Sequence, residues 1–156
     1  MKIRGIIEED FINYKKPSMV VITPYCSFKC EKEYGCSICH NSDVVKLPII
    51  DISDEEIIER YKHNPISEAI VFCGLEPFDS NDIESLINSF RNSFPDDIVI
   101  YTGYTKEECI ERFNWVYKYH NIIIKYGRFI PNSSHCYDKI LGVELASENQ
   151  YAEKIE

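Results

Sequence analysis

Four of the seven cysteines of the chain fall within fourteen consecutive residues. They are Cys26, Cys30, Cys36 and Cys39, in the spacing C-x3-C-x5-C-x2-C. Thiolates this close in sequence can converge on one metal ion or cluster, because the thiolate is the form of cysteine that ligates metals. Left unligated in a loop, the same thiols would be open to oxidation. The spacing therefore predicts a metal centre between residues 26 and 39.

Two kinds of metal centre fit these cysteines. Four thiolates can close a tetrahedral structural zinc site, which usually shows two short-spaced pairs. Alternatively, three thiolates can hold a [4Fe–4S] cluster and leave one iron open to a small-molecule ligand. The spacing alone does not choose between them. The position of the loop favours the cluster, because the loop directly follows a predicted strand at the functional edge of a sheet.

Strands and helices alternate along the chain. Apolar runs predict strands at 19–23, 69–73, 98–101 and 121–124. Ser53, Asn81 and Thr105 each precede a glutamate by three residues, which predicts the start of a helix. Strands that are apolar throughout are covered on both faces, so the pattern indicates an α/β fold with a parallel sheet and alternating helices. The 156 residues suit a single domain, residues 1–156, and the tail from Gly142 has no assignable pattern.

The carboxyl ends of the predicted strands carry the unusual residues. In folds of this class, function lies at that edge of the sheet. The first strand is followed by the cysteine loop, residues 24–44, the second by Gly74-Leu75-Glu76-Pro77 and the third by Thr102-Gly103-Tyr104. We therefore expect these three segments to meet.

Charge and hydropathy exclude several classes of protein. The chain has 17 basic and 26 acidic residues, a net charge of −9, which argues against a nucleic-acid partner. No apolar run approaches the roughly 20 residues that cross a bilayer. The first residues include Glu8, Glu9 and Asp10, unlike a secretory signal. We expect a cytoplasmic protein, where disulfides do not explain the cysteines.

Five short motifs, in order, carry a resemblance to a known family. They are Cys26-x3-Cys30 with Cys39-His40-Asn41, Gly74-Leu75-Glu76-Pro77, Tyr101-Thr102-Gly103-Tyr104-Thr105, Gly127-Arg128-Phe129 and Ala146-Ser147-Glu148-Asn149-Gln150. With these motifs the chain resembles the activating enzymes of anaerobic ribonucleotide reductase, a branch of the radical S-adenosylmethionine superfamily. The family signature is C-x3-C-x2-C, so this chain has additional residues between Cys30 and Cys39.

The resemblance implies a fold, two cofactors and a set of site residues. The fold would be a shortened, partial TIM-type barrel. A [4Fe–4S] cluster would be held by Cys26, Cys30 and Cys39, with Cys36 as the alternative to Cys30. S-adenosylmethionine would bind close to a set of seven residues, namely Gly74, Leu75, Glu76, Pro77, Tyr101, Thr102 and Asn149.

The resemblance also implies an activity and two partners. The enzyme would cleave S-adenosylmethionine reductively and generate a glycyl radical on a large reductase subunit, with electrons from a low-potential donor. Part of the site would be closed by that subunit. Two departures leave alternatives open: Tyr126 stands where the family has Asp, and residues 13–17 replace a glycine-rich step. The alternatives are a radical enzyme with another substrate and a zinc-stabilised binding module without radical chemistry.

The remaining cysteines and histidines have simpler interpretations. Cys73 and Cys109 are expected to be small core residues, and Cys136 is an incidental thiol. His40 is expected to shape the cluster loop. The other three histidines have no neighbouring carboxylate or nucleophile in a recognisable arrangement, so no role is assigned to them.

Overall fold

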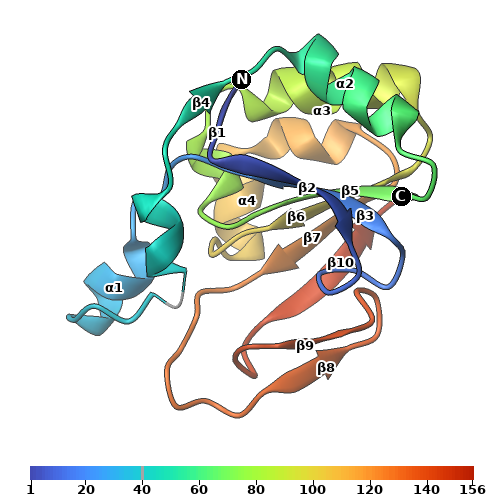
Figure 1. Ribbon diagram of the computed structural model, residues 1–156. Helices are drawn as coiled ribbons and strands as arrows, with labels where there is room; N and C mark the ends of the chain where they lie inside the picture. The colour runs from blue at the N-terminus through green and yellow to red at the C-terminus, as the bar shows by residue number, and fades with distance from the viewer. Residues whose placement is uncertain (40) are drawn as a thin grey trace.

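The computed structural model describes residues 1–39 and 41–156. Within these residues a central six-stranded sheet has the order β10-β7-β6-β5-β3-β2 (Figure 1). Its strands are β2 (Gly5–Asp10), β3 (Ser18–Ile22), β5 (Ala69–Cys73), β6 (Asp97–Tyr101), β7 (Ile122–Tyr126) and β10 (Tyr151–Ile155). Two small antiparallel pairs lie outside it, β1 (Lys2–Ile3) with β4 (Ile50–Asp51) and β8 (Cys136–Asp138) with β9 (Val143–Leu145).

The middle of the central sheet is parallel. Strands β3, β5, β6 and β7 run in the same direction, whereas β2 and β10 are antiparallel to their neighbours. The expected parallel sheet with alternating helices is therefore confirmed for the central strands, in a mixed α/β fold. No barrel closes within the described residues, because β2 and β10 end the sheet on opposite sides.

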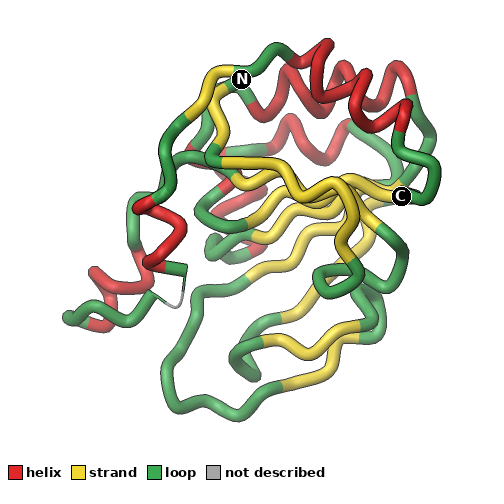
Figure 2. Tube along the Cα trace, in the orientation of Figure 1, coloured by secondary structure: helices red, strands yellow, loops and turns green. Residues whose placement is uncertain are grey.

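Three helices cover one face of this sheet, as Figures 1 and 2 show. They are α2 (Asp54–His63), α3 (Ile83–Ser93) and α4 (Lys106–Arg112). Their apolar side chains and those of the alternate strand residues form the larger core cluster, in which Phe72, Phe90 and Ile100 are fully buried. The chain between these elements also forms short helical turns at Ser42–Lys46, Pro77–Asp79 and Asn114–Lys118.

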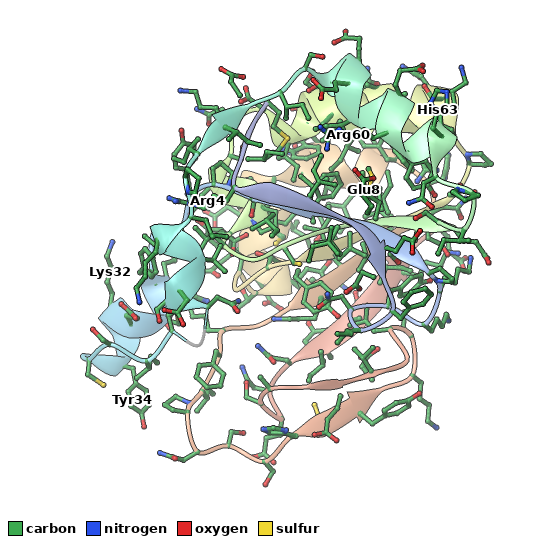
Figure 3. The ribbon with its side chains drawn as sticks, viewed as in Figure 1. Arg4, Glu8, Lys32, Tyr34, Arg60 and His63 are labelled. Atoms are coloured by element: carbon green, nitrogen blue, oxygen red, sulfur yellow. The ribbon has the colours of Figure 1, made fainter. Side chains whose placement is uncertain are left out.

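The other face of the sheet is covered only in part. A smaller cluster, which includes Val71, Val99 and Ile123 from the strands, packs against Leu141 and Leu145 around the β8–β9 hairpin. The fourth helix, α1 (Lys29–Tyr34), projects from the carboxyl edge of the sheet and buries none of its residues. Figure 3 shows Lys32 and Tyr34 of α1 pointing away from the sheet.

Local sequence signals placed two of the three expected helix starts correctly. Ser53 and Thr105 accept hydrogen bonds from the backbone N–H groups of Glu56 and Glu108 at 3.1 and 3.2 Å. The start expected at Asn81 is wrong: α3 begins at Ile83, after Asp82, which makes no capping hydrogen bond with its side chain. The unassigned tail forms β9 and β10, and β10 pairs with β7.

None of the helices in the described part of the chain is long and apolar enough to cross a membrane.

The buried strand β6 provides a test of the packing. Ile100→Val removes one methyl group from a fully buried side chain, and we expect the free energy of unfolding to fall by about 1 kcal/mol. Ile110→Val on α4 is the matched control, because Ile110 is 50% exposed and its loss of a methyl group leaves no cavity. Equal effects in chemical denaturation would contradict this placement of the core.

Candidate functional site

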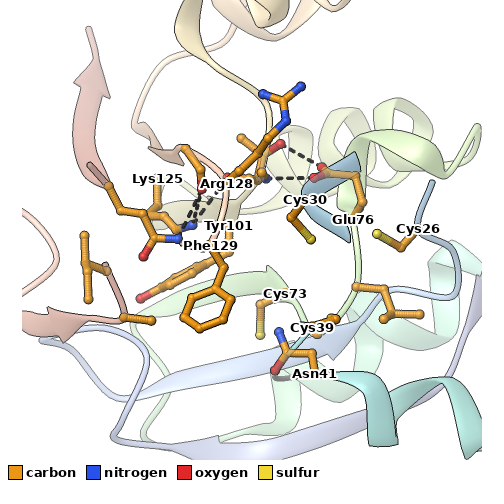
Figure 4. Close-up of a pocket in the computed structure, with 18 of the residues that line it drawn as sticks. Cys26, Cys30, Cys39, Asn41, Cys73, Glu76, Tyr101, Lys125, Arg128 and Phe129 are labelled. Carbon is orange, nitrogen blue, oxygen red and sulfur yellow. Dashed lines mark hydrogen bonds between the residues drawn. The ribbon is translucent and has the colours of Figure 1, made fainter. Parts of the chain in front are cut away.

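A cavity of about 380 Å³ opens at the carboxyl edge of the sheet, on the face opposite the helices. It is lined by residues at and after the ends of β5, β6 and β7, by residues that follow β3, and by β9 (Figure 4). The segments that the sequence predicted to meet at this edge do meet here. Most of the predicted site residues line the cavity, namely Cys26, Cys30, Cys39, Gly74, Leu75, Glu76, Tyr101 and Thr102.

Three thiols of the cysteine loop face this cavity and the fourth thiol of the loop does not. Cys26, Cys30 and Cys39 are half-buried and line it, whereas Cys36 is exposed and is absent from the lining. Burial, together with the smaller effect of the nearby charges of Glu76 and Asp79, raises the pKa of Cys26 to about 12. Burial also raises the pKa of Cys30 and of Cys39, and the charge of Cys39 adds to the effect on Cys30. In the cluster-free protein these thiols are therefore held protonated at neutral pH.

The donor set and its surroundings fit an iron–sulfur cluster. Three sulfur donors around one cavity suit a [4Fe–4S] cluster, whose ligands bind separate irons. No three His, Cys, Asp or Glu side chains of residues 1–39 and 41–156 are arranged to hold a single metal ion. His40, expected to shape the loop, lies outside the described residues.

Hydrogen bonds at both ends shape the cysteine loop. At its start, the backbone N–H of Ser27 donates to a carboxylate oxygen of Asp79 at 2.6 Å, and the backbone N–H of Glu76 donates to the carbonyl of Tyr25 at 2.8 Å. At its end, Glu31 accepts from the backbone N–H of Cys39 at 3.0 Å. The loop is thus tied to the segment after β5 and to its own helix.

Charged side chains, rather than apolar contacts, hold α1 in place. Arg128 donates two hydrogen bonds to the Glu108 carboxylate, at 2.7 and 2.9 Å, and its Nε lies 3.0 Å from the Glu33 carboxylate of α1. Lys29 of α1 lies 3.7 Å from Glu108 and 4.3 Å from the ring centre of Tyr104. Because α1 buries no residue, its position depends on these ion pairs.

The buried carboxylate of Glu76 joins the ends of β5 and β6. It accepts hydrogen bonds from the Thr102 hydroxyl at 2.7 Å, the Gly103 backbone N–H at 2.8 Å and the Phe78 backbone N–H at 3.2 Å. Burial raises its pKa to about 7, against the lowering effect of these hydrogen bonds. Glu76 therefore shapes the cavity wall, and all three of its hydrogen bonds come from groups of the protein itself.

Gly74 brings the backbone close to the cysteine loop. Its backbone φ of 96° is one that residues with a Cβ rarely adopt. A Cβ at this position would also lie 2.7 Å from Cγ2 of Ile22. The turn after β5 can follow this path only with glycine.

Two predicted cosubstrate residues lie outside the cavity lining. Pro77 is buried beside Phe78 in the turn that follows Glu76. Asn149 lines a second, neighbouring cavity with Arg128 and donates a hydrogen bond to the Arg128 carbonyl at 2.9 Å. Tyr126, where the related family has Asp, points into the core and shares a 2.9 Å hydrogen bond with Tyr117.

The cavity also contains side chains that sequence reasoning did not select. Lys125 and Phe129 line it, and the signal available for Lys125 was a basic residue at the end of an otherwise apolar strand. Cys73, expected in the core, packs against the smaller cluster but also lines the cavity. Cys109 is fully buried, as expected. Cys136 donates through its Sγ to the Ser147 carbonyl at 3.4 Å.

The chain belongs to the family described as the 4Fe-4S single cluster domain, whose model matches residues 18–150. The matched range includes all four cysteines of the loop and the turn after β5. Neither a curated protein nor a solved structure matches the chain.

The ion pair that holds α1 makes stability depend on pH. The hydrogen bonds from Arg128 lower the pKa of Glu108 from 4.5 to about 2. A carboxylate with a depressed pKa stabilises the fold above its unfolded value, and this contribution is lost as the pH falls from about 4.5 towards 2. We expect Glu108→Gln to be less stable than the wild type at pH 6, with the difference shrinking towards pH 2.

The control for this pH dependence is Glu111→Gln, an exposed glutamate on the same helix. Gln at position 108 can still accept from the Thr105 backbone N–H, so the helix cap is kept. Urea denaturation at several pH values measures both variants. A constant difference between the wild type and Glu108→Gln across this range would contradict the assignment.

Proposed function

We propose that this 4Fe–4S single cluster domain is a radical S-adenosylmethionine enzyme of the type that activates glycyl radical enzymes. The observation that carries the proposal is the shared cavity, in which three half-buried thiols face the Gly74–Glu76 turn and the end of β6. The motif resemblance identifies the same segments as cluster and cosubstrate sites. A cavity of about 380 Å³ falls within the range of roughly 300–1,000 Å³ that small-molecule sites occupy.

In this proposal Cys26, Cys30 and Cys39 hold the [4Fe–4S] cluster. Cys36 is the alternative ligand, and its exposure outside the cavity lining favours Cys30. When bound and reduced by a low-potential donor, the cluster would supply the electron for cleavage of a carbon–sulfur bond of S-adenosylmethionine to methionine and a 5′-deoxyadenosyl radical. That radical would remove hydrogen from a glycine of the large reductase subunit.

The residues of the chain bind and orient the cosubstrate. Gly74 and Leu75 offer backbone groups to its methionine part, and Glu76 fixes their position through Thr102 and Gly103. Tyr101 is held by a hydrogen bond from its hydroxyl to the Asn13 carbonyl at 2.6 Å, so its ring forms a fixed wall of the cavity. Asn149 acts from the neighbouring cavity by holding the backbone of Arg128.

The fold supports a partner that completes the site. The four parallel strands would correspond to a shortened, partial TIM-type barrel, with the site at their carboxyl ends. Because the sheet ends on β2 and β10 without closing, the large subunit would cover the open side of the cavity. The electron donor would approach the exposed side of the cysteine loop, in the cytoplasm.

One observation favours a second candidate, a radical enzyme of the same superfamily with another substrate. Tyr126 occupies the place of the related family's Asp, and its buried hydroxyl contacts Tyr117 rather than the cavity. The activation experiment described below distinguishes the two candidates.

Cysteine variants test the ligand set. We expect Cys30→Ala to abolish cluster assembly, because one of three ligands is lost, and Cys36→Ala only to weaken it. Cys136→Ala, remote from the loop, should leave the iron content unchanged. The measurement is iron and sulfide per chain after anaerobic reconstitution, with the visible spectrum. The opposite result for Cys30 and Cys36 would place the second ligand at Cys36.

A second experiment tests the reaction. The reconstituted and reduced protein should convert S-adenosylmethionine to methionine and 5′-deoxyadenosine, detected by liquid chromatography. Mixed with an anaerobic ribonucleotide reductase, it should produce a glycyl radical signal in electron paramagnetic resonance. Cleavage without that signal would favour another substrate, and a stable cluster without cleavage would contradict the radical mechanism.

A further inference from the structure

Lys125 is a buried cation on the cavity side of the sheet. It is the fourth residue of β7, and its side chain is 7% exposed. Its neighbours Ile124 and Tyr126 face the helices and belong to the larger core cluster, so strand alternation turns Lys125 to the opposite face. Figure 4 shows it at the cavity together with Tyr101 and Arg128.

The ammonium group of Lys125 has only main-chain carbonyls as hydrogen-bond partners. It donates to Gly127 at 3.2 Å and to Thr102 at 3.4 Å, and it lies 5.8 Å from the ring centre of Tyr101. No carboxylate of the described residues lies within ion-pair distance of it. Burial lowers the pKa of Lys125 to about 8, and the charge of Glu76 opposes this effect, so the group carries its proton at neutral pH.

The other cations that line the cavity already have carboxylate partners. Arg128 is engaged by Glu108 and Glu33, and Lys29 lies against Glu108. The nearby Glu76 carboxylate is itself occupied by the donors on Phe78, Thr102 and Gly103. Within residues 1–39 and 41–156, Lys125 is thus the one cation lining the cavity that has no carboxylate within ion-pair distance.

A buried ammonium group without a close counter-ion is unfavourable, and a bound anion reduces this cost. A single ammonium balances one negative charge, which matches a carboxylate. A phosphate carries more charge and is usually bound by several donors, often the guanidinium of an arginine, but Arg128 is already engaged.

We propose that Lys125 binds the carboxylate of the ligand that fills this cavity. The proposal rests on the proposed function to the extent that it identifies this group as the carboxylate of the methionine part of S-adenosylmethionine. Lys125 would then hold the carboxylate end of that part from the end of β7. It acts as a specificity residue that selects amino-acid derivatives over amines.

A double comparison tests this contact. The reconstituted protein is kept oxidised, and equilibrium dialysis measures the dissociation constants of S-adenosylmethionine and of its decarboxylated form. We expect Lys125→Met to weaken binding of S-adenosylmethionine about tenfold and of the decarboxylated form less than about twofold. Lys125→Arg keeps the charge and should recover part of the loss. Lys106→Met, at a partly exposed lysine of α4 that pairs with Glu153 and does not line the cavity, should change neither constant.

The two proposals fail in different ways. Equal weakening of both nucleosides by Lys125→Met, or no weakening of either, would overturn the carboxylate contact and leave the proposed function intact. If the wild type binds neither nucleoside, the proposed function is contradicted, and L-methionine and 3-(methylsulfanyl)propylamine serve as the pair of probes. Loss of methionine binding in Lys125→Met would then support the carboxylate site, and unchanged or absent binding would overturn it.

Thermal unfolding of each variant separates binding from folding. If Lys125→Met does not fold, Lys125→Gln provides the same comparison with a polar side chain of similar length. The carboxylate contact is overturned if Lys125→Gln folds and binds S-adenosylmethionine as tightly as the wild type.

Discussion

The carboxylate of Glu76 lies in the interior, where each of its hydrogen bonds must come from the protein. Three donors supply them, one from the turn after β5 and two from the end of β6. Leaving this buried carboxylate without hydrogen bonds would destabilise the fold by more than one such bond stabilises it. The carboxylate and its three donors are therefore held in a single arrangement. The width of the cavity between two adjacent strand ends follows from this contact, and so does the path of the Gly74 turn.

The two faces of the sheet differ because of how they are covered. On one face α2, α3 and α4 pack against Phe72 and Ile100 in a close-packed core. On the other, the small β8–β9 hairpin packs against part of the strands, and β9 forms one wall of the cavity at the carboxyl edge. The cysteine loop extends from this edge on a helix with no buried residue, so a rigid scaffold carries a ligand loop held mainly by charges.

Charge pairing therefore has two roles at this edge. The guanidinium of Arg128 pairs with Glu108 and Glu33, and these contacts hold the loop against the sheet. Lys125 has only carbonyl partners and leaves a positive charge inside the cavity. The first arrangement is complete within the chain, whereas the second is completed by what binds there. Among the described residues of this net acidic chain, Lys125 is therefore the one cavity cation without a carboxylate partner. It lies where a ligand anion can reach it.

Local signals in the sequence determined the four central strands, the helix starts at Ser53 and Thr105 and the cysteine loop, because these depend on neighbouring residues and on apolar runs. They also predicted that the ends of β3, β5 and β6 meet, since parallel strands share an edge. They did not determine the antiparallel edge strands β2 and β10, whose exposed residues lack an apolar run. Only the tertiary structure decided that Lys125 and Cys73 line the cavity, and that Cys30 faces it while Cys36 does not. Which face a strand residue presents, and how an insertion folds back, depend on packing between segments that are distant in sequence.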